Sequence, residues 1–310
     1  MSDSTKKYSP LSKASRDLLV RQKKRRATLA AYLFLAPYAV LLVMFGIIPV
    51  TYAFGMSFFD TIEGTFWGLT NYRAAIDDYR LGASITNVLT FVVLWVSGTL
   101  LFVTALSLML DAIGRRWSVV LRTVYFLPGA ITSSAVVVLW LFLLDPLVSP
   151  FQMGFAAIGL ETRQEVVSSL GFASMFALMA FFTHSGGWIV VMGGALSSLS
   201  SEVIDAARVD GANLWQQAIR IKLPMIWRSI SLMGILTFAV GLQLFVEPQL
   251  MRLAGPQYSR EDWAVNQLAF QYAFNFGDFG IAAALSTMLL AVSLTIALIL
   301  IFATKFYKVK

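Results

Sequence analysis

The chain has 310 residues, of which 58% are hydrophobic and only 13% are charged, whereas soluble globular domains carry about 25% charged residues. This composition excludes an ordinary soluble domain and indicates a protein of the lipid bilayer. The net charge is +7, but residues 1–27 hold nine basic and two acidic side chains, so the rest of the chain is neutral and does not indicate nucleic-acid binding. The absence of cysteine excludes disulfides, thiolate metal sites and cysteine nucleophiles.

A basic tail, residues 1–27, begins the chain and ends in the cluster RQKKRR at residues 21–26. Next to an apolar run, such a cluster predicts a topology anchor at the membrane surface. That run is much longer than the 7–15 residues of a signal peptide, and no small-residue cleavage site closes it, so we expect no cleavage there. Residues 28–310 are expected to form one membrane domain without internal repeats.

Six apolar runs follow the tail, and each supplies the roughly 20 residues that a helix needs to cross about 30 Å of hydrocarbon. They are Leu29–Met56, Ile85–Leu110, Val119–Leu144, Gly171–Ala195, Ile226–Val246 and Gly280–Thr304. Barrel strands would alternate apolar and polar residues, which these runs do not. The sequence therefore predicts an all-α, polytopic bundle of six transmembrane helices. Pro37, Pro49 and Pro128 are expected to bend the helices in which they lie.

Lysine and arginine are distributed unequally between the two sides of this bundle. Nineteen of the 24 lie in the tail, in two connections on the same side, or after the last run at Lys305, Lys308 and Lys310. Basic loops remain in the cytoplasm, so both termini are predicted to be cytoplasmic.

The connection at residues 196–227 is polar and helix-prone, although it lies between two of the most hydrophobic runs. Ser200 or Ser201 can cap a helix there, and the charges of Glu202 and Asp205 favour the positive end of that helix. The pattern predicts a helical element on the cytoplasmic membrane face. It either docks onto a soluble partner or is an ordinary amphipathic surface helix.

Gly211 permits a sharp change of direction within this connection. A second short helix is predicted to run through Trp215 to about Ile221, and Pro224 suits the first turn of the next span. The whole connection is therefore predicted to be a helix–turn–helix.

The residues of this connection have a recognisable order. Asp205-Ala-Ala-Arg-Val-Asp-Gly-Ala212, followed by Ile221-Lys-Leu-Pro224, resembles the EAA loop of permease subunits of ATP-binding cassette (ABC) importers, in the form EAAxxDGA…IxLP typical of the carbohydrate-uptake (maltose/glycerol-3-phosphate) type. We call residues 196–227 the EAA-like loop. Asp205 replaces the usual glutamate and keeps its charge. Ala218 stands where an aromatic is common, and Arg228 where a second proline often follows.

The resemblance covers nearly all of the chain beyond the tail. Asn87 is similar to the family's asparagine at the start of its second core span, and Arg122–Pro146 is similar to its third span. Residues Ala254–Ser286 match the family's GGP…AF…G.A.A…S pattern at Gly255, Pro256, Ala273, Phe274, Gly280, Ala282 and Ala284.

The resemblance implies a permease of the type I ABC importer fold in a bacterial plasma (inner) membrane. It implies four kinds of partner: a second homologous permease subunit, two copies of an ABC ATPase, an extracytoplasmic sugar-binding protein and the carbohydrate itself. The EAA-like loop would be the coupling helix that contacts one ATPase. Its expected contact residues are Glu202, Asp205, Ala206, Ala207, Asp210, Gly211, Ala212, Leu223 and Pro224.

The chain contains no GxxxxGK[ST] phosphate-binding loop, so ATP and Mg²⁺ are expected in the partner ATPase and no cofactor is expected in this chain. It is predicted to be a transport subunit and not an enzyme. A multispan enzyme would need paired carboxylates, a Ser–His arrangement or metal ligands, and the sequence has one histidine, no HExxH and no GxSxG. A stand-alone ion-coupled transporter would leave the EAA-like loop unexplained, whereas a permease for glycerol-phosphate compounds remains an alternative.

Polar and aromatic residues within the spans are candidates for the substrate pathway. Gln243 and Glu247 are four residues apart, which predicts one helix face with groups for sugar hydroxyls, although Glu247 can also be an interfacial residue. His184, the only histidine, cannot build a His-rich metal site, and it either forms an interhelical hydrogen bond, contacts substrate or relays protons. Trp140 and Trp188 either stack on sugar rings or pack between helices.

Overall fold

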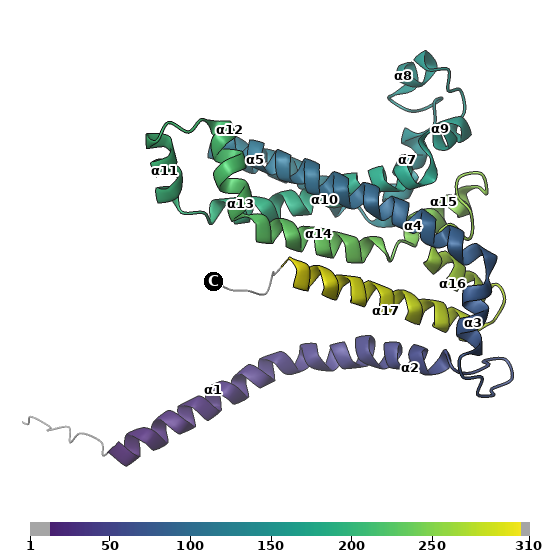
Figure 1. Cartoon of the computed structure of the whole chain (residues 1–310), viewed down its shortest axis with the longest axis horizontal. Helices are drawn as coiled ribbons and strands as arrows, with labels where there is room; N and C mark the ends of the chain where they lie inside the picture. Colours follow the sequence, from purple (N-terminus) through teal and green to yellow (C-terminus); the bar gives the residue numbers. More distant parts are fainter. Residues whose placement is uncertain (1–12, 305–310) are drawn as a thin grey trace, which may run out of the picture. The chain divides into compact units, whose positions relative to one another are not determined.

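The computed structural model describes residues 13–304, with side chains from residue 23 onward (Figure 1). The first part of the basic tail and Lys305, Lys308 and Lys310, on which part of the orientation prediction depends, lie outside the described residues. Within the described residues the chain is almost wholly helical, and its β-structure is one isolated bridge between Phe59 and Phe66. The all-α prediction is therefore confirmed.

The chain divides after Gly55 into two units, which are described separately. The first unit holds α1 (Lys13–Leu42), the π-helical turn η1 (Val43–Ile47) and most of α2 (Ile48–Met56). Pro49 follows η1 closely and cannot donate to the carbonyl group four residues before it. A wider π turn accommodates this missing donor, whereas the bend predicted at Pro49 stays a prediction.

The second unit contains the remaining elements. They are α3 (Thr70–Asp77), α4 (Tyr79–Gly98), η2 (Thr99–Val103), α5 (Thr104–Ala112), α6 (Arg115–Phe126), η3 (Leu127–Ala130), α7 (Ser133–Leu143), α8 (Gln152–Ala157), α9 (Arg163–Leu170), α10 (Phe172–Ser197), α11 (Ser201–Val209), α12 (Leu214–Gln216), η4 (Gln217–Lys222), α13 (Leu223–Met225), α14 (Trp227–Gly241), α15 (Val246–Ala254), α16 (Val265–Phe274) and α17 (Phe279–Ala303).

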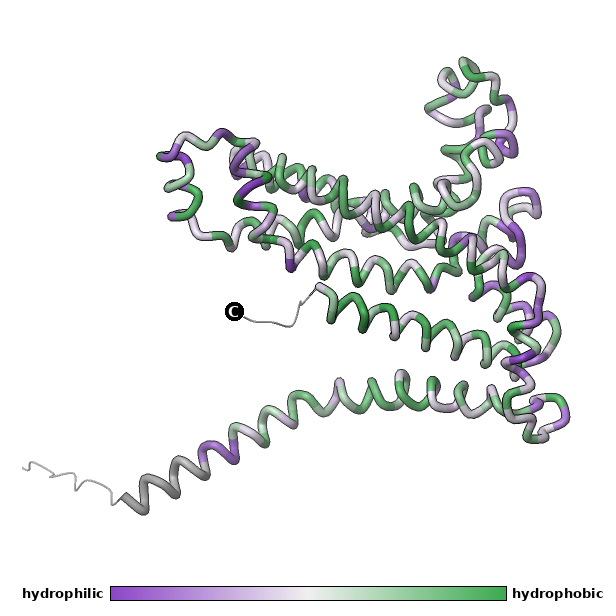
Figure 2. The backbone as a smooth tube through the Cα atoms, viewed as in Figure 1, coloured by the Kyte–Doolittle hydropathy of each residue, from purple (hydrophilic) through white to green (hydrophobic). Residues whose placement is uncertain are grey.

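Four described helices are long and apolar enough to cross a membrane without a break. They are Lys23–Met56, Tyr79–Ala112, Phe172–Ser197 and Phe279–Ala303. Two further pairs of helices reach the same criterion only together, and they bend by 97° between η3 and α7 and by 65° between α13 and α14. Six spans are obtained if each bent pair crosses once. Figure 2 shows hydrophobic residues along α10, α14 and α17 and hydrophilic residues at the connections.

The third predicted span is therefore not the continuous helix that its apolar run indicated, and the 65° bend lies at the start of the fifth run. Pro128 lies in η3, directly before the 97° bend, so the predicted proline bend is confirmed. The fifth span ends at Gly241, earlier than predicted, and α15 begins at Val246. Pro248 explains this difference, because its ring would clash with a helical carbonyl group at residue 244, whereas a proline is tolerated in the first turn of α15.

Helix α10 lies at the centre of the second unit and packs against α4, α5, α6 and η3. One apolar cluster joins α10 to α4, α7, α9 and α15, and a second joins it to α5 and α14. Glycines bring α6 and α10 into close contact: a Cβ atom at Gly186 would lie 2.8 Å from the Cα atom of Phe126. Lipid provides no hydrophobic driving force for helix association, and the close packing that small residues permit takes its place.

Candidate functional site

The first arm of the EAA-like loop is α11, which ends in a Schellman motif. The amide of Ala212 donates to the carbonyl oxygen of Ala207 at 2.9 Å, and the amide of Gly211 donates to that of Arg208 at 3.0 Å. Gly211 has φ of +82°, a left-handed conformation that glycine adopts without strain. The predicted turn at Gly211 is thus present. Ser200 is the N-cap residue, but its side chain makes no capping hydrogen bond.

The returning arm begins at Asn213, two residues after the turn. The side chains of Asn213 and Gln216 form a capping box, with reciprocal bonds of 2.8 and 2.9 Å to the backbone. The helix continues as the π-helical turn η4, in which buried Gln217 donates to the carbonyl oxygen of Ala212 at 2.7 Å. Pro224 lies in α13, before the 65° bend, and not in the first turn of α14 as the sequence had suggested.

Most of the predicted contact residues of the EAA-like loop are accessible. Those classed as exposed are Glu202, Asp205, Ala206, Asp210, Gly211 and Pro224, whereas Ala212 and Leu223 are half-buried and Ala207 is buried. Asp205 forms an exposed ion pair with Arg208 at 3.1 Å. Ala207 therefore lies on the packed side of α11, which contacts η4 of the returning arm, and the charged residues face outward.

Large apolar side chains that the sequence analysis did not select also lie on this surface. Val209 is 89% exposed, Trp215 is 74% exposed and Leu214 is 61% exposed. Single exposed apolar residues are ordinary, but three of them on either side of one tight turn form a surface suited to a partner. The local sequence does not indicate this surface, because charged and polar residues surround the three apolar ones.

A second contact of the loop was also missed, because nothing in the sequence connects its two residues. Lys222 Nζ lies 2.7 Å from Asp111 Oδ2, near the end of α5. Both side chains are mostly buried, with 13% and 21% of their surface exposed.

The candidate pathway residues His184, Glu247 and Gln243 lie in α10, in α15 and in the turn before α15. The ring of His184 packs edge-on against Trp95 at 5.4 Å, and its Nδ1 lies 3.0 Å from the carbonyl oxygen of Ala180. Glu247 is half-buried and lies in the first turn of α15. Gln243 lies in the turn between α14 and α15, so it does not share a helix face with Glu247 as predicted.

The two tryptophans occupy different surroundings. Trp140 contacts Phe182 edge-on at 6.4 Å, and its indole nitrogen is buried without a hydrogen-bond partner. Trp188 packs against the apolar cluster that joins α10 to α5 and α14. Packing thus accounts for Trp188, whereas the indole N–H of Trp140 is available to donate a hydrogen bond to a ligand.

The break between η3 and α7 adds polar groups that the sequence analysis did not assign. Ile131 and Thr132 have extended backbones, and the side chains of Thr132 and Ser134 are exposed. The break lies against α10, since a Cβ atom at Gly129 would be 3.0 Å from the carbonyl oxygen of Thr183. Irregular backbone at membrane depth is tolerated where it lines a water-filled cavity or is covered by protein.

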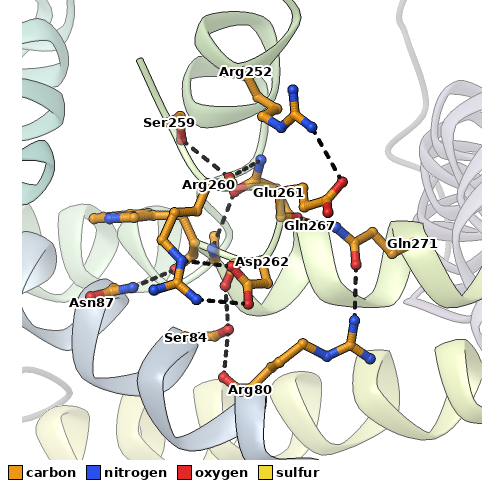
Figure 3. Close-up of polar contacts among 12 residues, drawn as sticks. Arg80, Ser84, Asn87, Arg252, Ser259, Arg260, Glu261, Asp262, Gln267 and Gln271 are labelled. Atoms are coloured by element: carbon orange, nitrogen blue, oxygen red, sulfur yellow. Dashed lines mark hydrogen bonds and ion pairs between the residues drawn. The ribbon is translucent and has the colours of Figure 1, made fainter. Parts of the chain in front are cut away.

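A polar network joins the start of α4 to the α15–α16 loop (residues 255–264) and to α16 (Figure 3). Its connecting hydrogen bonds are Ser84 Oγ to the carbonyl oxygen of Asp262 at 2.5 Å, Asn87 Nδ2 to that of Trp263 at 3.1 Å, and Arg80 Nη1 to Gln271 Oε1 at 3.2 Å. A polar cavity of about 330 Å³ adjoins the network. Asn87, which resembles a family residue, thus anchors the loop to α4.

Asp78 holds the same region together at the N-cap of α4. It accepts hydrogen bonds of 2.8 Å from the amide and Nη2 of Arg80, and one of 2.8 Å from the hydroxyl group of Tyr272. Burial raises the pKa of Asp78, but the bonds from Arg80 and Tyr272 outweigh burial, and the pKa lies below its ordinary value of 3.8. The carboxylate is therefore charged at neutral pH.

Comparison with known proteins identifies the family. Residues 102–308 match the model of the binding-protein-dependent transport system inner membrane component. The alpha-glucoside transport system permease protein AglF of Rhizobium meliloti is 30% identical over 290 residues, which are 89% of this chain and 81% of that protein. The osmoprotective compounds uptake permease protein GgtC of Synechocystis is 29% identical over 270 residues, 83% of this chain and 92% of that protein.

A solved structure has the same fold. It is a crystal structure of a bacterial ABC transporter involved in the import of the acidic polysaccharide alginate, with a TM-score of 0.76, 21% identity, and coverage of 93% of this chain and 98% of that chain. The expected ABC importer permease fold is thereby confirmed, and the protein is a multi-pass membrane protein. The chain belongs to the binding-protein-dependent transport system inner membrane component family.

Proposed function

We propose that this chain is one permease subunit of an ATP-driven ABC importer that moves a carbohydrate or sugar derivative inward by alternating access. Its partners are a second permease subunit, two copies of a separate ATPase and an extracytoplasmic sugar-binding protein. Both termini and the EAA-like loop lie in the cytoplasm. The carbohydrate class is supported by relatives named for alpha-glucoside and for sulfoquinovosyl glycerol transport.

The geometry of the EAA-like loop is the observation that carries this proposal. Buried Ala207 and Gln217 fix its two arms, while the turn at Gly211 presents Val209 and Trp215 to solvent. An exposed apolar surface flanked by charges is suited to bind a soluble partner, and the movement of that partner can then be passed to the loop. Closure of the ATPase pair on ATP would pull this loop, and α10 and α14, which continue from its two ends, would move with it.

The substrate pathway includes His184, Glu247, Gln243 and Trp140, with Trp188 as a packing residue beside them. Hydroxyl-rich ligands need donors and acceptors next to apolar ring faces, which imidazole, carboxylate, amide and indole groups provide. ATP and Mg²⁺ bind to the ATPase subunits and not to this chain.

Co-purification from the native host in mild detergent tests this proposal. We expect a second permease and two copies of an ATPase to remain bound, and ATPase activity to be stimulated by a sugar-loaded binding protein. A chain that purifies alone, with transport activity of its own, would contradict it.

Gly211 supplies a sharper test within the assembled importer. Aspartate and asparagine have similar size and both tolerate positive φ, so Gly211→Asp and Gly211→Asn differ mainly in charge. A carboxylate on the docking surface must lose water on contact, so Gly211→Asp is expected to lower uptake per ATP hydrolysed by roughly fivefold or more. Gly211→Asn should retain most of the coupling. Normal uptake by a stably expressed Gly211→Asp importer would refute the assignment.

A further inference from the structure

The ion pair between Lys222 and Asp111 links two parts of the chain that are 111 residues apart. Lys222 is the last residue of η4, on the returning arm of the EAA-like loop, and Asp111 precedes the last residue of α5. The separation of 2.7 Å is that of a direct charge-assisted hydrogen bond. Because both side chains are largely buried, water and salt screen this pair less than an exposed one.

Helix α5 does not itself require this carboxylate. Asp111 lies in the last turn, where the negative end of the helix dipole disfavours an acidic side chain. Lys222 compensates both this repulsion and the loss of water around Asp111. Apolar residues of the same size often stabilise a packed site as well as a buried ion pair does, so this pair points to a role in fixing a geometry.

Asp111 stands at one end of a single long helix. Residues Tyr79–Ala112 form 34 helical residues without a sharp bend, which corresponds to about 51 Å. Near its other end, Ser84 and Asn87 bond the backbone of the α15–α16 loop, and Arg80 bonds Gln271 of α16 (Figure 3). The same helix therefore holds the EAA-like loop through a charge pair and the α15–α16 loop through hydrogen bonds, on opposite sides of the membrane.

We propose that the ion pair between Asp111 and Lys222 couples the EAA-like loop to the helix Tyr79–Ala112, and that stimulation of the ATPase by the sugar-loaded binding protein depends on this pair. This inference rests on the proposed function of the EAA-like loop. The loop is joined covalently to α10 and α14, and the ion pair makes it move with α4 and α5 as well. Lys222 and Asp111 are positioning residues, since they act through the loop and do not touch substrate.

The test uses the complete importer in lipid nanodiscs, with ATPase activity measured with and without the sugar-loaded binding protein. The variants are Lys222→Gln, Asp111→Asn, Lys222→Arg and the reversed pair Lys222→Asp with Asp111→Lys. Arg220→Gln is the matched control, because Arg220 has the same charge and lies in the same turn, but is exposed. Retention of the ATPase during purification is recorded for each variant.

We expect Lys222→Gln and Asp111→Asn to lower the stimulation by the binding protein about fivefold or more, with basal ATPase activity and assembly retained. Lys222→Arg and the reversed pair should recover most of the stimulation, and Arg220→Gln should resemble the wild type. Wild-type stimulation in both single variants, or a loss that neither Lys222→Arg nor the reversed pair recovers, would overturn the inference while leaving the proposed function intact. A wild-type importer that retained no ATPase would instead refute the proposed function.

Discussion

The contact between α6 and α10 at Gly186 allows a quantitative prediction. A Cβ atom at this position would lie 2.7 Å from the carbonyl carbon of Tyr125 and 2.8 Å from the Cα atom of Phe126, and nearer still to the carbonyl oxygen of Tyr125. Ordinary contacts begin at about 3.4 Å, so Gly186→Ala must displace the backbone of α6 by about 0.7 Å or more. Backbone cannot rotate away as a side chain can. Overpacking of this kind costs about 1–3 kcal/mol.

Gly187→Ala is the matched control for Gly186→Ala. A Cβ atom at Gly187 has no neighbouring atom within 4 Å, and both residues lie within α10. The intrinsic helix preference of alanine over glycine, about 1 kcal/mol, is shared by the two variants and cancels in their difference. The measurement is the free energy of unfolding of the purified protein, followed by tryptophan fluorescence as SDS is titrated into mild-detergent micelles. We expect Gly186→Ala to be less stable than Gly187→Ala by about 1–3 kcal/mol, and equal stabilities would refute the close contact.

Two further predictions concern Asp78 and the membrane orientation. Because the pKa of Asp78 is lowered in the folded protein, its carboxylate stabilises the fold fully above the ordinary pKa of 3.8, and this effect is lost as the pH falls through the lower folded-state value. Asp78→Asn should therefore lower the melting temperature at pH 7, and the difference from the wild type should shrink below pH 3.8. A difference in melting temperature that does not change with pH would contradict this prediction. Since the chain has no cysteine, single substitutions can report orientation: a membrane-impermeant maleimide added outside right-side-out vesicles should label Ser168→Cys and not Ser201→Cys. The reverse pattern would place the EAA-like loop outside.

The positions of the membrane helices followed largely from the sequence, whereas their breaks did not. Apolar runs located every long helix, because the thickness of the bilayer fixes the length of a span. Pro128 predicted the bend in the third span, but its size of 97° did not follow from the sequence. The early end of α14 at Gly241 was missed, since the run stays apolar to Val246 and hydropathy does not register the obstruction by Pro248.

The candidate site divides in the same way. The order of residues in the EAA-like loop predicted its turn at Gly211, because a glycine after a short helix favours the left-handed conformation that ends it. The exposure of Trp215 and Val209 depends on which side of each arm packs against the body, which the local pattern does not specify. Gln243 lies in the turn between α14 and α15 and does not share a helix face with Glu247, because α14 ends earlier than its apolar run does.

By itself, the sequence determined that this protein is a helical membrane protein, where its apolar runs lie, and that the EAA-like loop interrupts them. Those properties depend on residues close together in the chain, through hydropathy, helix capping and turn chemistry. The tertiary structure alone decided that Lys222 meets Asp111, and that Ser84 and Asn87 hold the α15–α16 loop. These contacts join distant residues across packed helices, and since lipid is as apolar as the helix surfaces, hydropathy does not indicate which faces meet.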